Sequence, residues 1–404
     1  MCMFIERLPF FYAYGGMQAL RLCKELRKRK VGVFIVSKIH DKKKRNWYIT
    51  KEIDGVTVYA MNCKSYIMLF LEHHFGLNLE YYFKAVFFLI RFRRKYDLVH
   101  VHGLSICHIL IVIPLKFLGK KTLAKFTTFR RDDLFSIRRT RFIGPLLLSI
   151  LSHFDGIVSI SSQFTETYMK FRRFLRHTKL FEVPNGVDIT EFRPVSPNEK
   201  LLLREQLDLP IQKKIVSYVG WISENKGVHL LIKSWQSVVA KRRDVLLLLI
   251  GPTKDKRFSK MIHSMIKLGD LEENISLTGF VNGSRVRKFL QASDIFIFLS
   301  KEEGHPNVLL EAASCGLPCI VTDAPWARDT LKNEAEGYLV DRDNSEQLRD
   351  SMMKLIKSRS LRLWLGGNAR KKMIERFSFG TIAKKYIGVY TQILRSKEKD
   401  SQKQ

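Results

Sequence analysis

Short apolar runs rich in β-branched and aromatic residues alternate with longer helical patterns along almost the whole chain. Strands and helices that alternate in this way are typical of parallel sheets covered by helices on both faces. The sequence therefore predicts an α/β protein made of two Rossmann-like series. The expected strands span residues 2–5, 31–37, 56–60, 97–102, 122–127, 156–161 and 179–183, and then 215–219, 245–250, 275–277, 295–299, 319–321 and 338–340.

A break in this pattern separates the two series. Pro184, Pro194, Pro197 and Pro210 interrupt the periodicity, and charged residues dominate between them, as is typical of an interdomain linker. A last helical pattern runs into a polar tail, which we expect to be disordered. We expect an N-terminal domain at 1–190, a linker at 191–212, a C-terminal domain at 213–375, a C-terminal helix packing back on the first domain at 376–395 and a disordered tail at 396–404.

The composition is that of a globular protein with a large excess of positive charge. Of the 404 residues, 46% are hydrophobic and 27% are charged, which argues against a disordered, collagen-like or fibrous chain. The 70 basic residues outnumber the 39 acidic ones, so the formal net charge is +31. A surplus of this size predicts a polyanionic partner, such as phospholipid headgroups, nucleic acid or a phosphorylated substrate.

Neither a membrane-spanning segment nor a disulfide framework is expected. The apolar runs at 104–115 and 142–151 are shorter than the ~18 residues that a spanning helix needs. The N-terminus lacks the basic region and cleavage site of a signal peptide. The 6 cysteines have no scaffold spacing, so we expect reduced thiols in a cytoplasmic protein that contacts the cytosolic membrane face peripherally.

The segment 300–318 carries the most chemical information. Glu303 follows an expected strand, and Glu311 lies in the helix that starts near Pro306. In an open parallel sheet, such a strand-to-helix junction lies at the ligand crevice. The backbone N–H groups at the start of this helix point toward an anion such as a diphosphate, which the helix dipole also attracts. Glu311 can accept hydrogen bonds from ribose hydroxyls, and Glu303 can accept one from a sugar hydroxyl.

This segment resembles the donor-site signature of the family 4 glycosyltransferases, which are retaining enzymes of the GT-B fold. The resemblance rests on two glutamates separated by seven residues, followed by Ala-Ser-Cys-Gly-Leu-Pro at 313–318 and Gly-Tyr-Leu-Val at 337–340. Further matches occur in the same order as in the family. They are Arg-Leu-Pro-Phe at 7–10 with Gly-Gly at 15–16, the strand end at 97–103, Pro-Asn-Gly-Val-Asp at 184–188 and the loop at 219–227.

The resemblance implies two Rossmann-like domains that face each other across a cleft, with the acceptor on the first and the nucleotide sugar on the second. It implies a fixed cation near the leaving diphosphate, for which Lys226 is the candidate, and close backbone approach at glycines without a Cβ. The expected catalytic residues are Glu303, Lys226 and His102. The expected donor-binding residues are Glu311, Gly15, Gly16, Gly304, Asn307, Val308 and Leu309.

The chain also departs from the family pattern. Family members usually carry Arg at the position of Trp221, and many carry a His after the strand that here ends in Thr-Thr at 127–128. This chain continues with Phe-Arg-Arg-Asp-Asp, so acceptor contacts or compensation for the missing charge are expected from Arg130, Arg131, Asp132 and Asp133.

No metal and no cofactor are expected besides the donor substrate. The Asp-Arg-Asp at 341–343 follows an expected strand and is interpreted as a helix cap or as solvated acidic residues rather than as a metal-binding motif. The dinucleotide fingerprint GxGxxG and the phosphate loop GxxxxGK[ST] are both absent, which argues against a dehydrogenase and a P-loop NTPase.

The predicted function is therefore retaining transfer of a sugar from a nucleotide diphosphate sugar to a glycan or lipid-linked acceptor. Basic clusters in the first half, and the aromatic and basic helix at 81–92, favour an anionic membrane surface as a partner. One alternative is a GT-B protein that has lost catalysis and binds a membrane or a partner. Another is nucleic-acid binding, which the lack of an RNA-binding or helix-turn-helix motif disfavours.

Overall fold

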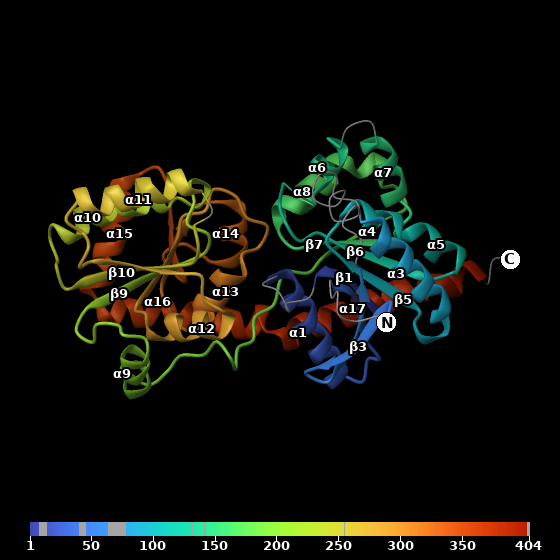
Figure 1. Cartoon of the computed structure of the whole chain (residues 1–404), viewed down its shortest axis with the longest axis horizontal. Helices are drawn as coiled ribbons and strands as arrows, with labels where there is room; N and C mark the ends of the chain where they lie inside the picture. The colour runs from blue at the N-terminus through green and yellow to red at the C-terminus, as the bar shows by residue number, and fades with distance from the viewer. Residues whose placement is uncertain are drawn as a thin grey trace. The chain divides into compact units, whose positions relative to one another are not determined.

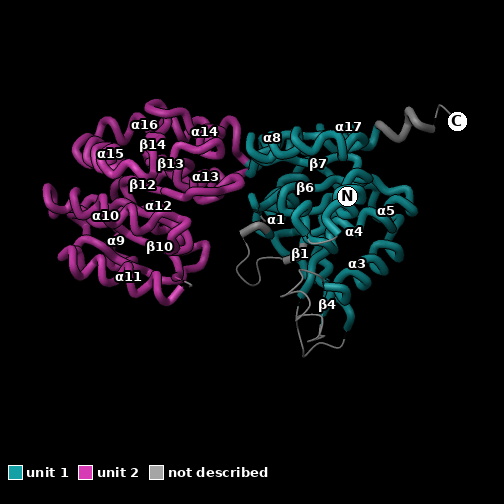
Figure 2. Tube along the Cα trace, turned by 90° about the horizontal axis from the view of Figure 1, so that it is seen from above, with its two compact units in different colours: residues 1–185, 379–404 teal, residues 186–378 magenta. Residues whose placement is uncertain are grey.

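The computed structural model describes residues 1–7, 14–39, 46–63, 78–130, 132–140, 143–253 and 255–401. The chain divides into two compact units (Figure 2). Unit 1 comprises Met1–Asn185 together with Phe379–Gln404, and unit 2 comprises Gly186–Ser378. Both units are α/β, as the sequence predicts.

Unit 1 is built on an eight-stranded sheet with the order β3-β4-β2-β1-β5-β6-β7-β8 (Figure 1). All neighbouring strands in it are parallel except β3 and β4. The strands are β1 (Cys2–Arg7), β2 (Phe34–Ile39), β3 (Tyr48–Ile53), β4 (Val56–Asn62), β5 (Leu98–His102), β6 (Lys121–Lys125), β7 (Gly156–Ser159) and β8 (Lys179–Glu182).

Two helical layers cover the faces of this sheet. Side chains alternate between the faces along each strand, so Cys2 and Phe4 join one buried cluster and Met3 and Ile5 join the other. The α1/α17 layer consists of α1 (Tyr14–Lys28) and α17 (Phe379–Ser401). The α3–α8 layer consists of α3 (Leu79–Arg91), η2 (Arg93–Lys95), α4 (Ile106–Leu110), α5 (Val112–Phe117), α6 (Leu134–Arg138), α7 (Gly144–Leu151), α8 (Ser162–Phe171) and η3 (Arg172–Phe174).

Strand β3 was not expected from the sequence, and it makes the sheet of unit 1 mixed rather than purely parallel. It pairs antiparallel with β4 through a two-residue turn at Asp54 and Gly55, which both have positive φ. Asp-Gly between two β-rich runs is a strong signal for a hairpin. Only Ile49 of β3 is buried, as is typical of an edge strand, so β3 lacks the apolar run that predicted the other strands.

Unit 2 is built on a six-stranded, all-parallel sheet with the order β11-β10-β9-β12-β13-β14. All of its strands were predicted from the sequence. They are β9 (Lys214–Val219), β10 (Val245–Ile250), β11 (Ile275–Gly279), β12 (Ile295–Phe298), β13 (Cys319–Thr322) and β14 (Gly337–Val340). The helices are α9 (Pro197–Gln206), η4 (Glu224–Lys226), α10 (Val228–Val239), α11 (Lys256–Leu268), α12 (Gly283–Ala292), α13 (Asn307–Ser314), α14 (Pro325–Thr330), α15 (Ser345–Lys357), α16 (Arg359–Lys372) and the π-helical η5 (Met373–Phe377).

The segment 191–212, expected to be a linker, is instead part of unit 2. It contains α9, which begins with a capping box in which Ser196 and Glu199 satisfy each other's backbone N–H groups. Pro197 occupies the first turn, where its missing N–H costs nothing, so this proline starts a helix rather than breaking one. The prediction of a linker was wrong because a proline can also occupy the first turn of a helix, as Pro197 does.

Buried polar contacts hold α9 to the rest of unit 2. Arg204 donates to Asp294 (2.8 Å) and to the carbonyl of Ala292 (3.0 Å), and Lys200 pairs with Asp294 (2.7 Å). Burial opposes ionisation of Asp294, but the charges of Lys200 and Arg204 and the hydrogen bond from the N–H of Ile215 outweigh it, so its pKa is lowered. Asp294 therefore remains ionised between two cations.

Helix α17 returns to unit 1 and closes one face of its sheet over a buried lysine. Lys125 at the end of β6 is 3% exposed, donates to Asn185 (3.1 Å) and lies over the ring of Tyr386 at 5.8 Å. Burial lowers its pKa to about 7. Helix α17 extends to Ser401, so it includes the first part of the tail that was expected to be disordered from residue 396.

All six cysteines are free and buried. Among the residues described, none of the helices has the length and apolar character needed to cross a bilayer.

Two neighbouring glycines of α16 provide a matched test of the packing in unit 2. A Cβ on Gly366 would lie 2.0 Å from the carbonyl oxygen of Gly316, whereas one on Gly367 would meet nothing within 4 Å. We expect Gly366→Ala to reduce the free energy of unfolding by about 1–3 kcal/mol because the helix must move away. Gly367→Ala should leave it unchanged or raise it by up to about 1 kcal/mol, because alanine favours the helix. Calorimetric unfolding measures both, and equal effects of the two variants would contradict this packing.

Lys125 should make stability depend on pH. Its pKa of about 7 lies below the unfolded value of 10.5, so between these values the unfolded chain binds more protons and stability rises with pH. We expect Lys125 to contribute on the order of a few kcal/mol to a rise in the free energy of unfolding from neutral to alkaline pH, and Lys125→Met to lack this contribution, so that the difference between the native chain and the variant changes with pH. Lys121→Met, on the same strand but paired with Asp155, is the control and should keep it. Denaturant titrations across pH test this, and an unchanged pH profile in Lys125→Met would contradict it.

Candidate functional site

The sheet of unit 2 has a topological switch point between β9 and β12. Strands β9, β10 and β11 follow one another outward on one side, and β12, β13 and β14 follow one another on the other side. All six strands are parallel, so the segments that follow β9 and β12 leave adjacent strands at the same edge of the sheet. Ligands in open α/β sheets bind at such a point.

The segment after β9 presents Lys226. Gly227 follows the short helix η4 directly, has a φ of 70° and is both the C-cap of η4 and the N-cap of α10. A Cβ at Gly227 would lie 2.6 Å from the carbonyl oxygen of Leu299, so only glycine allows this approach to the segment after β12. The N–H of Lys301 also donates to the carbonyl of Asn225 at 3.0 Å. These contacts hold Lys226 next to the neighbouring loop.

Lys226 and Glu303 form an ion pair at this edge, in which the Nζ of Lys226 donates to the Oε1 of Glu303. The two side chains are 20% and 17% exposed, so the pair is largely shielded yet open to solvent. Lys226 also lies 5.7 Å from the centre of the Phe298 ring at the end of β12. Two residues that are 77 positions apart in the chain, both expected in the site, are thus in direct contact.

Glu311 lies near the same junction, in helix α13. Pro306 precedes the first residue of this helix, and Glu311 is only 6% exposed. Gly304, Asn307 and Val308 occupy the junction as expected. The N–H of Leu309, however, already donates to the carbonyl of Pro306 (3.2 Å), so it is not available to a ligand as the sequence suggested.

Tyr218 and His305 border the site but were not found from the sequence. The buried Tyr218 hydroxyl donates to the carbonyl of Trp221 (2.7 Å), and burial, with the nearby charge of Glu303, raises its pKa well above the usual value. His305 is 5% exposed, and its Nε2 lies 3.4 Å from the hydroxyl of Thr330. The position of His305 in the sequence, between Glu303 and Pro306, could have indicated that it borders the site. Trp221 itself is 43% exposed.

Unit 1 holds the remaining expected residues, and its own switch point lies between β1 and β5. His102 ends β5 and is 5% exposed, and neither of its ring nitrogens has a hydrogen-bond partner among the described residues. Burial, followed by the charges of His100, Lys125 and His108, lowers its pKa well below the usual value, so the ring is neutral. Gly15 and Gly16 lie in the first turn of α1 rather than in a loop.

The loop after β6 uses its two aspartates to hold its own shape. Asp132 accepts hydrogen bonds from the N–H and hydroxyl of Thr127 and from the N–H of Thr128, and burial raises its pKa to about 6. Asp133 caps α6 and also accepts from the N–H of Arg130, whose φ is 58°. The expected residue Arg131 lies outside the described residues.

The structure offers the described residues no obvious metal site. No group of three or more His, Cys, Asp or Glu side chains suited to a metal occurs in the ranges described. The Asp341 carboxylate accepts from the N–H of Asp343 at 3.0 Å in a local turn, and the residue that caps α15 is Asn344 rather than either aspartate.

Comparison with known families accounts for both units. Residues 15–191 match the model of the glycosyltransferase family 4, and residues 199–372 match the model of the glycosyl transferases group 1. The two matches follow each other along the chain and together include the loops of Lys226 and Glu303.

The curated relatives include glycosyltransferases. The capsular polysaccharide biosynthesis glycosyltransferase CapM of Staphylococcus aureus is 29% identical over 184 residues, which span 46% of this chain and 47% of CapM. The phosphatidylinositol N-acetylglucosaminyltransferase GPI3 subunit of Saccharomyces cerevisiae is 25% identical over 77% of this chain and 66% of its own length. The spore coat protein SA of Bacillus subtilis is 25% identical over 79% of this chain and 84% of its own length.

Solved structures share the fold at low sequence identity. Anabaena HepE in complex with UDP and glucose superposes with a TM-score of 0.74 at 16% identity, covering 97% of this chain and 100% of that one. The sucrose-phosphate synthase of Thermosynechococcus elongatus gives a TM-score of 0.76 at 18% identity, covering 98% and 100%. With two parallel-sheet units and both sequence families matched, this chain belongs to the group 1, family 4 glycosyltransferases and has the GT-B fold.

Proposed function

We propose that the enzyme transfers a sugar from a nucleotide diphosphate sugar to an acceptor with retention at the anomeric carbon. Unit 2 binds the donor, and unit 1 binds the acceptor. The observation that carries this proposal is the Lys226–Glu303 pair, which lies with Glu311 at the switch point of a parallel sheet.

Lys226 and Glu303 can exchange their ion pair for contacts with the donor when the donor binds. Without donor, Lys226 and Glu303 neutralise each other in a partly shielded place. A diphosphate attracts the ammonium group of Lys226, and Glu303 is then released to accept a hydrogen bond from a hydroxyl of the transferred sugar. Glu311, in α13, accepts hydrogen bonds from the ribose hydroxyls. The N–H groups of Asn307 and Val308 and the start of α13 face the phosphates.

The proposed reaction breaks the bond between the anomeric carbon and the leaving phosphate oxygen, and forms a bond between that carbon and the acceptor oxygen. Both oxygens lie on the same face of the sugar, so the configuration is retained. The leaving phosphate oxygen takes the proton of the acceptor hydroxyl. Lys226 stabilises the negative charge that grows on the diphosphate, which is the largest contribution expected from the protein.

His102 is proposed to act on a sugar hydroxyl in unit 1. Its buried neutral ring can donate from one nitrogen and accept at the other, and no described residue engages either nitrogen. Asp132 and Asp133 are assigned to the shape of the loop after β6, and Arg130 remains the candidate in it for compensating charge.

Relatives support a nucleotide sugar and a lipid-linked or glycan acceptor. HepE has been crystallised with UDP-glucose, and a mannosyltransferase of Corynebacterium glutamicum, 25% identical over 58% of this chain, is GDP-mannose-dependent and acts on a phosphatidylinositol mannoside. We propose a cytoplasmic enzyme that attaches peripherally to the cytosolic face of an anionic membrane. The alternative of a protein that has lost catalysis is not favoured, because the ion pair is intact.

Replacing the two glutamates should separate their roles. Glu311→Ala removes the acceptor for ribose and should weaken binding of free nucleotide and nucleotide sugar alike, by about 1.5–3 kcal/mol. Glu303→Ala should weaken nucleotide sugar relative to free nucleotide, and bare nucleotide should bind as well or better because Lys226 no longer has to leave its partner. Isothermal titration with UDP, GDP, ADP and their sugars measures these affinities.

Glu272→Ala, an exposed glutamate before β11, is the control and should bind like the native chain. The opposite order would refute the assignment, with Glu303→Ala impairing bare nucleotide and Glu311→Ala impairing only the sugar-linked form.

The tryptophan at position 221 provides a second test of the donor site. An indole has one N–H and no charge, so Lys226 carries the diphosphate charge in this loop alone. We expect Lys226→Ala to abolish measurable binding of nucleotide sugar, and Trp221→Arg to tighten binding and raise the transfer rate. Lys301→Ala, an exposed lysine beside the same loop, should change little. Native affinity in Lys226→Ala would show that the cation lies elsewhere.

A further inference from the structure

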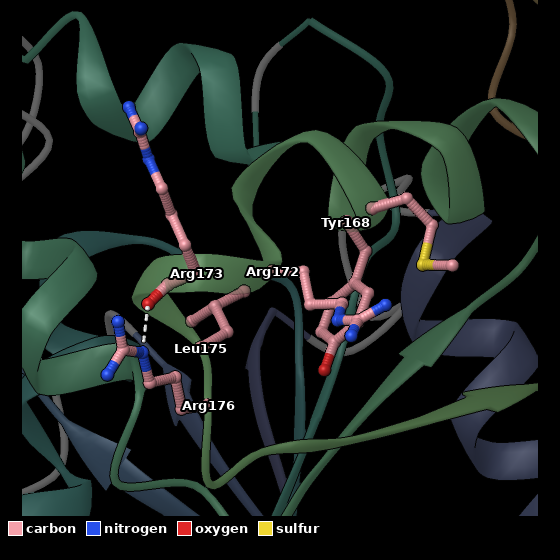
Figure 3. Close-up of a pocket in the computed structure, with 6 residues that line it drawn as sticks. Tyr168, Arg172, Arg173, Leu175 and Arg176 are labelled. Carbon is pink, nitrogen blue, oxygen red and sulfur yellow. Dashed lines mark hydrogen bonds between the residues drawn. The ribbon is translucent and has the colours of Figure 1, made fainter.

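A pocket rich in arginine opens on unit 1 at the end of α8, and none of its lining residues is assigned to the reaction. It has a volume of about 610 Å³ and is formed by the last turn of α8, by η3 and by the residues after it (Figure 3). The lining residues are Tyr168, Met169, Arg172, Arg173, Leu175 and Arg176.

No described side chain neutralises the positive charge of this pocket. Among the described residues, no carboxylate pairs with Arg172, Arg173 or Arg176. Instead, the Nε of Arg176 donates to the backbone carbonyl of Arg173 (3.2 Å), as the dashed line in Figure 3 shows. The Arg173 guanidinium lies 4.9 Å from the centre of the Phe174 ring. Three like charges around one cavity repel each other, so the pocket favours an anion. The guanidinium fork matches phosphate oxygens in particular.

Exposed apolar side chains lie beside this charge on α8 and η3, and others occur on the same layer of unit 1. Met169 and Phe174 are 55% and 42% exposed beside the pocket, and Leu146 on α7 is 59% exposed. Arg138 and Lys170 lie over the aromatic rings of neighbouring residues, with their charges at the surface. Arginine and lysine next to exposed rings and aliphatic side chains are typical of a surface that meets the headgroup region of a bilayer.

The distribution of exposed apolar residues is strongly one-sided. Of the eleven large apolar side chains that are exposed in the described part of unit 1, ten lie on the α3–α8 layer and only Leu394 lies on the α1/α17 layer. The ten are Phe83, Phe87, Ile90, Ile113, Phe117, Phe135, Ile143, Leu146, Met169 and Phe174. Isolated exposed apolar residues need no explanation, but exposed rings and aliphatic side chains on the layer that also carries Arg172, Arg173 and Arg176 favour that layer as the interaction face.

We propose that the Arg172–Arg176 pocket binds the phosphate of an anionic phospholipid while the neighbouring apolar side chains enter the bilayer surface. The inference rests on the proposed membrane attachment, not on the transfer reaction. A lipid is favoured over a soluble phosphate because only a lipid supplies an anion and an apolar phase to the same surface. It is favoured over nucleic acid because the exposed residues of this layer include aliphatic side chains such as Leu146 and Met169, which suit a bilayer surface and on which a base cannot stack as it could on the ring of Phe174.

The test compares binding of the full chain to vesicles of phosphatidylcholine with and without phosphatidylglycerol, by cosedimentation. Arg172→Gln/Arg176→Gln should weaken binding to the anionic vesicles by about tenfold or more, because each cation near the surface adds to the affinity. The control Arg27→Gln/Lys30→Gln removes the same charge from the opposite layer of unit 1 and should bind nearly like the native chain. Circular dichroism verifies that both variants are folded.

Two more variants separate the contributions of charge geometry and apolar contact. Arg172→Lys/Arg176→Lys keeps the charge but loses the fork, so it should bind between the native chain and the glutamine variant. Met169→Ser/Phe174→Ser should weaken binding to anionic vesicles and leave a larger fraction of the remaining binding sensitive to salt.

The outcomes distinguish the pocket from the wider proposal. If the glutamine variant binds anionic vesicles like the native chain, the pocket assignment is wrong while membrane attachment stands. If the native chain does not bind anionic vesicles at low salt, both are wrong, and the transfer reaction is tested separately by nucleotide-sugar titration. Binding of soluble glycerol phosphate as tightly as of vesicles, or a loss confined to binding of polyuridylic acid, would also overturn the lipid assignment.

Discussion

The common direction of the strands in unit 2 is the constraint on which the proposed donor site depends. Because all six strands are parallel, every strand-to-helix segment of the sheet leaves at one edge, and the reversal of strand order between β9 and β12 leaves room there. Gly227 then lets the backbone after β9 approach Leu299 after β12. Lys226 and Glu303 meet as a consequence, without any element devoted to joining them.

The two units differ in where their polar and apolar side chains lie. In unit 2 the burial of nearly continuous apolar strands, such as Val245–Ile250, leaves the polar chemistry to the loops at one edge. In unit 1 polar groups enter the sheet itself, since His100 is buried within β5, and His102 and Lys125 are buried at the ends of β5 and β6. The outer face of its α3–α8 layer, by contrast, carries exposed apolar and basic residues together.

Much of this fold could be predicted from the sequence, because its signals are local. The strands of unit 2 are short apolar runs between turns, and each was expected at its place. The errors came from segments with a second local signal. Pro197 lies in the first turn of α9, directly after the capping residue Ser196, so this proline marks the start of a helix. Asp54 and Gly55 form the turn that pairs β3 with β4. What could not be predicted was proximity: the pairing of Lys226 with Glu303, the engagement of the Leu309 N–H and the internal bonds of Asp132 depend on the folded chain.

Hydrogen–deuterium exchange of the full chain, with and without a nucleotide diphosphate sugar, tests the central claim most directly. A donor bound at the switch point of unit 2 predicts slower exchange of the backbone amides in the segments 221–228 and 303–311, because both lie at that edge of the sheet. A series of UDP-, GDP- and ADP-linked sugars identifies the donor that produces this protection. Protection confined to unit 1, or none in either segment at saturating concentrations of every donor, would contradict the account.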